Sequence, residues 1–178
     1  MNYSGIAVRY SKALFALAEE KGILEEVQTD IALLKSVYET ESEFVRFLEF
    51  PALASNKKIE TFNILFDGKM NKTTLEFLKL VTKNRRESYL YLISLEFQRQ
   101  YKIKKGIKTV TFTSVSEISD SVRKIIRELL LEKYGSQIEI LEQTNKDLIG
   151  GYVLRVDDDQ YDASVAKQLE KIKRSFKA

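Results

Sequence analysis

The chain has 178 residues, of which 44% are hydrophobic and 11% aromatic, enough to bury a core in one ordinary domain or two small ones. Its formal net charge is only +3, so charge does not mark it as a dedicated nucleic-acid binder. It contains no cysteine and no histidine, which excludes disulfides, thiolate metal sites and the commonest general base of enzymes.

Nothing in the sequence predicts insertion into a membrane. No apolar run approaches the roughly 20 residues that a membrane span needs. The first residues also lack the charged and apolar regions of a secretory signal. We therefore expect a cytosolic protein, or one at most peripheral to a membrane.

The first predicted helix runs from a cap at Ser4 to a stop at Lys21-Gly22. At about 100° per residue its apolar side chains cover roughly 200°, twice the stripe of an ordinary surface helix. These side chains are Ile6, Ala7, Val8, Tyr10, Ala13, Leu14, Phe15, Leu17 and Ala18. Two interpretations stay open: a central helix packed on two sides, or a helix with one flank left for a partner.

Five further helices are predicted in the first 105 residues. The second helix covers about residues 24–38, and the third is a short segment capped by Ser42 and ended by Pro51. The fourth runs from Ser55 to the stop at Asp67-Gly68, and the fifth has Thr73 and Glu76 at capping-box spacing. The sixth is a long segment that ends at Lys105-Gly106. The fifth helix, like the first, has apolar residues nearly all round its axis. Short connections between six helices predict a compact antiparallel bundle over residues 1–105.

Residues 106–178 have a different pattern. Residues 108–113 alternate, with Val110 and Phe112 on one face, and predict a strand. A helix opened by Ser119 follows and ends at Tyr134-Gly135, and a second strand is predicted over residues 137–142. The helix has an apolar stripe that we expect to cover the sheet, formed by Val122, Ile125, Ile126, Leu129 and Leu130.

The last part of the chain contains the only Gly-Gly pair, Gly150-Gly151, which opens a strand of alternating residues from Tyr152 to Val156. The three aspartates at 157–159 are interpreted as a turn. Asp162 or Ser164 is expected to cap a final helix with the apolar residues Val165, Leu169, Ile172 and Phe176. The predicted fold is therefore mainly α: an N-terminal six-helix bundle followed by a small α+β domain.

No constellation of residues predicts catalysis or a cofactor. The aspartates at 157–159 are adjacent, and Gln168 stands where an EF-hand loop needs its Glu. Gly150-Gly151 has no following Lys-Ser/Thr and opens a strand, which excludes a P-loop. Without a base to activate a serine, we expect no enzyme, no metal and no cofactor.

Several short sequences, however, are typical of one family. They are Tyr10-Ser11-Lys12-Ala13-Leu14-Phe15, Phe50-Pro51 with Lys57-Lys58 after it, Asn84-Arg85, Leu148-Ile149-Gly150-Gly151, and Asp162-Ala163-Ser164 with Leu169. In order and spacing over nearly the whole chain they resemble the delta subunit of F-type ATP synthases, whose mitochondrial counterpart is the oligomycin sensitivity-conferring protein. The chain departs from the family at residues 115–119, where an alanine and a proline are usual.

The resemblance implies a stator subunit that performs no chemistry and links the catalytic head to the peripheral stalk, so that rotation is coupled to ATP synthesis by proton flow. The N-terminal domain would bind N-terminal helical segments of alpha subunits. The domain of residues 106–178 would join the b subunits. The protein would then be peripheral, on the cytoplasmic face of the bacterial inner membrane, and would meet the membrane only through the complex.

The resemblance also places the alpha-binding surface on the first and fifth helices, whose apolar arcs are too wide for their own bundle. We expect the groove to be lined by Tyr10, Ala13, Leu14, Leu78 and Val81. The family residues expected to be structural are Gly150, Gly151, Asp162, Ser164 and Leu169.

One alternative comes from the basic residues. A basic RNA-binding adaptor would use Arg85, Arg86, Lys102, Lys104 and Lys105, and its binding would weaken steeply with salt. The opposing interpretation is a solvated face whose alkyl stems cover apolar surface.

Overall fold

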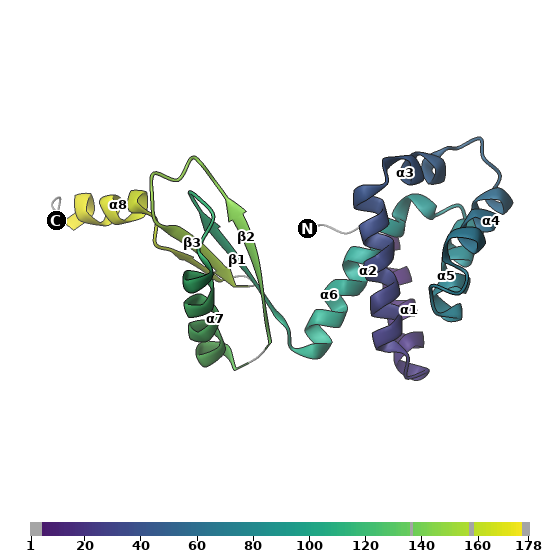
Figure 1. Ribbon diagram of the computed structural model, residues 1–178, viewed down its shortest axis with the longest axis horizontal. Helices are drawn as coiled ribbons and strands as arrows, with labels where there is room; N and C mark the ends of the chain where they lie inside the picture. The colour runs from purple at the N-terminus through teal and green to yellow at the C-terminus, as the bar shows by residue number, and fades with distance from the viewer. Residues whose placement is uncertain (1–4, 136, 157–158, 176–178) are drawn as a thin grey trace. The chain divides into compact units, whose positions relative to one another are not determined.

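The structure is a computed structural model that describes residues 5–135, 137–156 and 159–175. It divides into two compact units, Met1–Tyr101 and Lys102–Ala178, so the boundary falls within helix α6 (Figure 1). The described residues form an all-helical first unit and an α+β second unit. This confirms the predicted mainly α fold.

The first unit is built from α1 (Gly5–Glu20), α2 (Leu24–Thr40), α3 (Ser42–Glu49), α4 (Ser55–Phe66), α5 (Lys72–Lys83), a 3-10 turn η1 (Glu87–Tyr89) and α6 (Leu90–Lys105). Their buried faces enclose one core. Phe44 meets the rings of Phe62 and Phe66 edge-on, with ring centroids 6.3 Å and 6.2 Å apart. These aromatic residues belong to the core of the bundle.

Two predicted helix caps are wrong. Ser42 is the first residue of α3, behind Glu41, and caps nothing with its side chain. Helix α5 is capped by Asn71, whose side chain accepts a hydrogen bond from the Thr73 N–H at 2.8 Å, so Thr73 and Glu76 form no capping box. Several cap-forming residues stand close together before α5, and sequence places helix ends only to within one or two residues. Ser4 lies outside the described residues.

Two buried carboxylates of the first unit accept hydrogen bonds, one between two helices and the other within a single helix. Asp30 on α2 accepts hydrogen bonds from the Asn71 N–H at 2.9 Å and from Thr74 Oγ1 at 2.6 Å, and burial raises the pKa of its carboxyl. Glu96 on α6 accepts from Arg99 Nε at 2.8 Å and Nη2 at 2.6 Å, and these bonds lower its pKa.

The second unit is a four-stranded sheet with two helices. It contains β1 (Lys108–Ser114), α7 (Asp120–Tyr134), β2 (Ile138–Thr144), β3 (Tyr152–Val156), β4 (Asp159–Asp162) and α8 (Val165–Ser175). The strand order is β2-β1-β3-β4, with β1 parallel to β2 and the other pairs antiparallel. Helix α7 is the crossover between the parallel strands (Figure 1).

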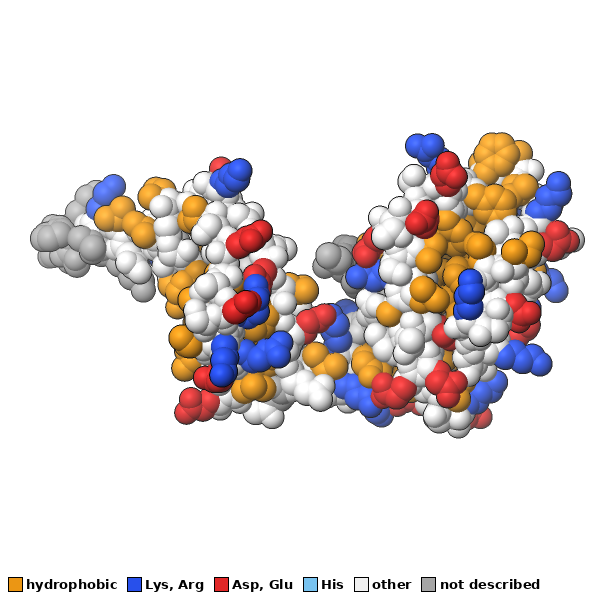
Figure 2. All heavy atoms as spheres, viewed as in Figure 1, with side chains coloured by type: hydrophobic (Ala, Val, Ile, Leu, Met, Phe, Trp, Pro, Cys, Tyr) orange, Lys and Arg blue, Asp and Glu red, His pale blue; other side chains and the backbone are white. Residues whose placement is uncertain are grey.

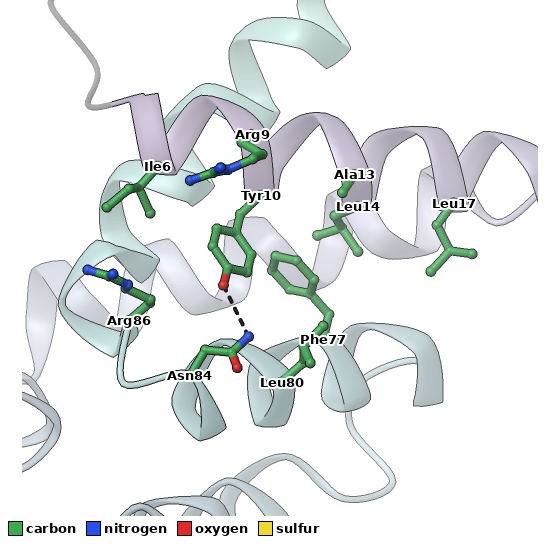
Figure 3. A pocket seen from close by; sticks show the side chains of 10 residues that line it. All are labelled: Ile6, Arg9, Tyr10, Ala13, Leu14, Leu17, Phe77, Leu80, Asn84 and Arg86. Atoms are coloured by element: carbon green, nitrogen blue, oxygen red, sulfur yellow. Dashed lines mark hydrogen bonds between the residues drawn. The ribbon is translucent and has the colours of Figure 1, made fainter.

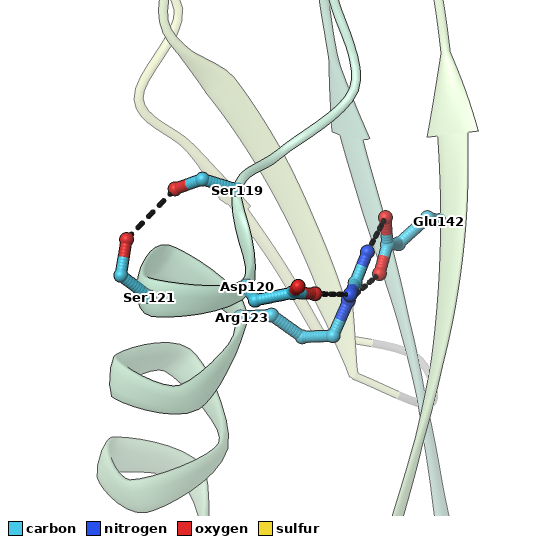
Figure 4. Close-up of polar contacts among 5 residues, drawn as sticks. All are labelled: Ser119, Asp120, Ser121, Arg123 and Glu142. Atoms are coloured by element: carbon cyan, nitrogen blue, oxygen red, sulfur yellow. Dashed lines mark hydrogen bonds and ion pairs between the residues drawn. The ribbon is translucent and has the colours of Figure 1, made fainter.

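Helix α7 is tied to β2 by a charged group at its first turn (Figure 4). Arg123 donates to both carboxylate oxygens of Glu142, at 2.5 Å and 3.1 Å, and also pairs with Asp120. These bonds lower the pKa of Glu142. Ser119 is the N-cap position, as predicted, but its Oγ lies 2.9 Å from Ser121 Oγ and does not cap the backbone.

Two predictions for the second unit are corrected. The segment after β3 was expected to be only a turn, but Asp159 begins a short edge strand that pairs with β3; residues 157 and 158 lie outside the described residues. The stripe on α7 was expected to cover the sheet as a whole. Only Ile126, Leu130 and Tyr134, spaced four apart, pack on the core, because a small sheet contacts only one narrow face of a helix.

Candidate partner-binding groove

Helices α1 and α5 lie side by side and leave an apolar hollow of about 620 Å³ between them (Figure 3). It is lined by Ile6, Arg9, Tyr10, Ala13, Leu14, Leu17, Phe77, Leu80, Asn84 and Arg86. A second hollow of about 470 Å³ continues along the same two helices, and Leu17, Phe77 and Leu80 line both. Together they form one surface, the α1–α5 groove.

The periodicity of the two helices explains why they have an apolar surface to spare. On α1, Ala7, Leu14 and Ala18 are buried in the core, and Ala13 and Leu17 are exposed beside them. The small side chain of Ala13 leaves room above the floor of the groove. The apolar arc of α1 therefore serves both the bundle and an open surface.

The structure places the predicted residues of α1 on the groove and corrects those of α5. Tyr10, Ala13 and Leu14 line it, Leu14 as a floor residue that is 1% exposed. Leu78 and Val81 are both 0% exposed in the core, so they do not line the groove. The flank of α5 that does so carries Phe77 and Leu80.

That flank was missed because α5 is apolar nearly all round, and periodicity alone does not orient such a helix. Phe77, Leu80 and Asn84 share one flank by their i, i+3, i+7 spacing. The buried residues Leu78 and Val81 are also spaced three apart, so spacing alone does not identify the flank that lines the groove.

The groove is apolar along its floor and mainly basic at its rim. Tyr10 meets Phe77 edge-on, with ring centroids 6.3 Å apart, and its hydroxyl accepts a hydrogen bond from Asn84 Nδ2 at 3.1 Å (Figure 3). Arg9 and Arg86 line the first hollow, and Lys21 and Lys72 line the second. Glu76 is the one acidic residue among the described lining side chains.

This arrangement offers no reactive group. Within residues 5–135, 137–156 and 159–175, no cluster of three or more histidine, cysteine or acidic side chains is placed to hold a metal. None of the described helices is both long and apolar enough to cross a bilayer. What the groove can do is bury the apolar face of another element.

The Gly150-Gly151 pair forms a close backbone contact between the start of β3 and the start of α8. Gly151 has φ +79°, and a Cβ there would lie 2.4 Å from the Ala163 carbonyl oxygen. The Val165 N–H donates to the Gly150 carbonyl at 3.0 Å. Gly151 is needed because a side chain has no space between these two backbones, whereas a Cβ at Gly150 would meet only the Val165 side chain, at 3.0 Å from its Cγ2.

Of the two candidate caps of α8, Ser164 is the residue that caps the helix, and Asp162 supports it. Ser164 Oγ accepts from the Lys167 N–H at 3.2 Å, as an N-cap does, while Asp162 Oδ1 accepts from the Ser164 N–H at 2.9 Å. Leu169 is 49% exposed. Phe176 and the side chain of Ile172 lie outside what the structure describes.

The second unit also has an apolar surface of its own. On α7, Val122, Ile125 and Leu129 are 41%, 55% and 60% exposed. Leu129 also lines a hollow of about 480 Å³ against β3 and β4, where Lys133 Nζ donates to the Tyr161 hydroxyl at 2.9 Å. That bond raises the pKa of Lys133 and lowers that of Tyr161.

The basic residues of the RNA-binding alternative are divided between the two units, with Arg85 and Arg86 in the first and Lys102, Lys104 and Lys105 in the second. Arg85 and Arg86 line different hollows, and Lys102 pairs with Glu139. Lys104 and Lys105 also take part in interactions. Acidic and basic side chains are interspersed on the visible face of each unit (Figure 2).

Comparison with known proteins points to one family. The family model of the ATP synthase delta (OSCP) subunit matches residues 6–176. ATP synthase subunit delta of Cytophaga hutchinsonii is 38% identical over 176 residues, which cover 99% of this chain and 96% of the relative. The corresponding subunit of Carboxydothermus hydrogenoformans is 34% identical over 99% of both chains.

Solved structures agree at the level of the fold. A chain in the cryo-EM structure of the Toxoplasma gondii mitochondrial ATP synthase hexamer matches with a TM-score of 0.80 and 21% identity, over 98% of this chain and 99% of that one. A chain of the Polytomella F-ATP synthase matches 59% of this chain and 93% of its own length, with a TM-score of 0.52 and 16% identity.

None of these similarities supports the RNA-binding alternative. The chain belongs to the ATP synthase delta (OSCP) subunit family, and it is a non-catalytic stator component of F-type ATP synthase.

Proposed function

We propose that the α1–α5 groove holds the N-terminal helical segment of an alpha subunit, and that the second unit joins the b subunits of the peripheral stalk. The observation that supports the first part most strongly is the groove itself: an open apolar surface between two helices that already fill the core with their other faces. A surface of this shape suits an amphipathic helix laid into a groove.

The length of the groove and the charge of its rim indicate what kind of helix it would bind. Its lining extends from Ile6 on α1 to Lys21 directly after that helix, about 22 Å at the helical rise of 1.5 Å per residue. A bound helix of about four turns would fill that length, with apolar anchors at i, i+3 or i+4 and i+7. The basic rim favours acidic residues on the flanks of the bound helix, which steer association more than they add affinity.

A link that transmits torque needs to stay closed during rotation. Roughly nanomolar affinity, about −12 kcal/mol per contact, would satisfy that need. The apolar residues Ala13, Leu17 and Leu80 at the open centre of the groove would supply most of it, because fully desolvated anchors dominate binding energy and exposed charges contribute little.

For the stalk, the exposed residues Val122, Ile125 and Leu129 support an attachment surface on α7. Their i, i+3, i+7 spacing makes one apolar stripe along the helix, which matches the pattern used in helix–helix packing. Attachment through such surfaces would keep the protein peripheral, at the cytoplasmic face of the bacterial inner membrane.

Isothermal titration calorimetry tests the groove. The titrant is a synthetic peptide of the N-terminal segment of the alpha subunit from the same organism, and the full chain is in the cell. Ala13→Arg should abolish binding because it fills the groove with a long charged side chain. Ala16→Arg, on an exposed position of α1 that does not line the groove, is the matched control and should bind normally. Equal behaviour of the two variants would exclude this site.

The stalk surface is tested by co-purification with the b subunits. Ile125→Arg should prevent attachment to b while leaving the alpha peptide affinity unchanged, because the two surfaces lie on different units. Loss of both interactions together would contradict this division of labour.

A further inference from the structure

Lys58 on α4 is almost fully buried, with 2% of the residue exposed. Its Nζ donates to the Leu48 carbonyl oxygen in α3 at 2.5 Å and to Glu87 Oε1 in η1 at 2.5 Å. The ion pair thus ties α4 to the connection between α5 and α6. Replacing a buried ion pair by apolar residues is often neutral or stabilising, and the best-attested use of such a pair is to specify one conformation.

The connection held by Glu87 contains a strained residue. Arg85 has φ +55° and is the one non-glycine residue with positive φ in the part of the chain that the structure describes. A side chain in this region costs about 1–2 kcal/mol. The turn closes α5 with the Arg86 N–H bonded to the Val81 carbonyl at 3.0 Å and the Arg85 N–H bonded to the Thr82 carbonyl at 2.9 Å, a motif that normally has glycine at the left-handed position.

The strained turn sends two consecutive arginines to different places. Arg86 lines the α1–α5 groove, at the end where Ile6 and Asn84 lie (Figure 3). Arg85 instead lines a separate cleft together with Lys58 and Glu87. The left-handed residue Arg85 sets the direction in which the chain leaves α5, so the turn determines which of the two cations reaches the groove.

Glu87 is fixed at both ends. Its carboxylate is held by Lys58, and its carbonyl oxygen accepts a hydrogen bond from the Tyr38 hydroxyl at 3.3 Å. We propose that the buried Lys58–Glu87 pair is a positioning device that holds the strained turn and thereby places Arg86 at the rim of the groove, where it faces an acidic residue of the bound helix. This rests on the proposed function of the groove.

The competing explanation is that the pair only stabilises the bundle. The two explanations differ in their effect on binding. A purely structural pair changes the unfolding temperature but leaves the affinity and salt dependence of the folded protein unchanged, whereas a positioning pair changes both through Arg86.

The experiment is a double-mutant cycle on the full chain, with the same alpha peptide measured by calorimetry at two salt concentrations. Lys58→Met with Glu87→Gln removes both charges, so neither is left buried and unpaired, and Arg86→Gln removes the positioned cation. Each should weaken binding about threefold and flatten its salt dependence, as expected for one exposed ion pair. Combined, they should weaken binding by the same factor. Lys57→Met, which removes the exposed charge next to Lys58, is the control and should bind normally.

Circular dichroism establishes that each variant is folded before binding is measured. If the double variant does not fold, Tyr38→Phe gives a second test, because it deletes only the hydrogen bond to the Glu87 carbonyl oxygen. Tyr38→Phe should weaken peptide binding in the unaltered chain and have no further effect on binding when Arg86→Gln is present. Unchanged affinity of the folded variants, or losses that multiply with that of Arg86→Gln, would overturn the proposal. Failure of the proposed function gives a different result: the unaltered chain would not bind the peptide at all.

Discussion

Replacement of Gly151 by alanine tests whether the Gly-Gly pair is a structural junction. The added Cβ would lie 2.4 Å from the Ala163 carbonyl oxygen and 3.0 Å from Ser164 Cα. Both are backbone atoms, so no side-chain rotation relieves the contact. The start of β3 and the start of α8 would have to move apart, which would lengthen the bond between the Val165 N–H and the Gly150 carbonyl.

Two contributions add up in this variant. The left-handed backbone of Gly151 costs an alanine about 1 kcal/mol. Forcing the two backbones apart costs about 2 kcal/mol more, in the range found for overpacked sites. The free energy of unfolding of the second unit should therefore fall by about 3 kcal/mol, a large share of the stability of a small domain.

Gly135→Ala separates these contributions. Gly135 also has a left-handed backbone, with φ +59°, but nothing lies within 4 Å of its added Cβ, so this variant should lose only about 1 kcal/mol. Urea unfolding followed by circular dichroism compares the two. Equal losses for the two variants would refute the argument from close backbone contact.

Three further predictions concern the first unit. Leu78→Ala should lower the free energy of unfolding by about 3 kcal/mol in thermal unfolding and leave the affinity for the alpha peptide nearly unchanged. Leu80→Ala should change the free energy of unfolding by less than about 0.5 kcal/mol and weaken peptide binding in calorimetry about tenfold. The reverse pattern would contradict the assignment of the two flanks of α5. Asp30→Asn should be more stable than the unaltered chain at pH 7, because the raised pKa of Asp30 means that its charged form opposes folding, and this advantage should disappear as the pH falls through that pKa. Glu96→Gln should be less stable than the unaltered chain at pH 7, and its stability should depend less on acid. The reason is that a carboxyl with a lowered pKa stabilises the fold at pH values above its ordinary pKa and loses this contribution as the pH falls. Melting curves at several pH values test the direction of the change for Asp30→Asn and for Glu96→Gln.

The sequence predicts the element order well because the local signals agree with the tertiary structure. Pro51 and the glycines at 22 and 68 separate helices whose apolar spacing is regular, and the glycines at 106 and 135 end a helix before a strand. The edge strand Asp159–Asp162 could not be recognised in the same way, since it is short, polar and exposed along its length, and only pairing with β3 makes it a strand.

The sequence predicts that α1 and α5 carry more apolar surface than their own core needs, but it predicts only part of the residues that line the groove. The arcs of α1 and α5 are too wide for one core, which identifies both helices. Which flank of α5 faces outward depends on the rotation of the helix about its own axis against α1 and α4. Residues 78 and 80 are both leucine, so the sequence alone does not show which of them is buried. The pairing of Lys58 with Glu87 was hidden for another reason: the two residues are 29 positions apart, and the family sequence that contains Lys58 does not indicate its partner.

The absence of cysteine from the chain allows the central claim to be tested in the assembled enzyme. Single variants Ala13→Cys and Ala16→Cys would be reacted with a maleimide, first as free protein and then within the complete ATP synthase. If an alpha segment occupies the α1–α5 groove, the thiol at position 13 should react at least tenfold more slowly in the complex, while the thiol at position 16 keeps its rate. An unchanged rate at position 13 in the assembled enzyme would contradict the account.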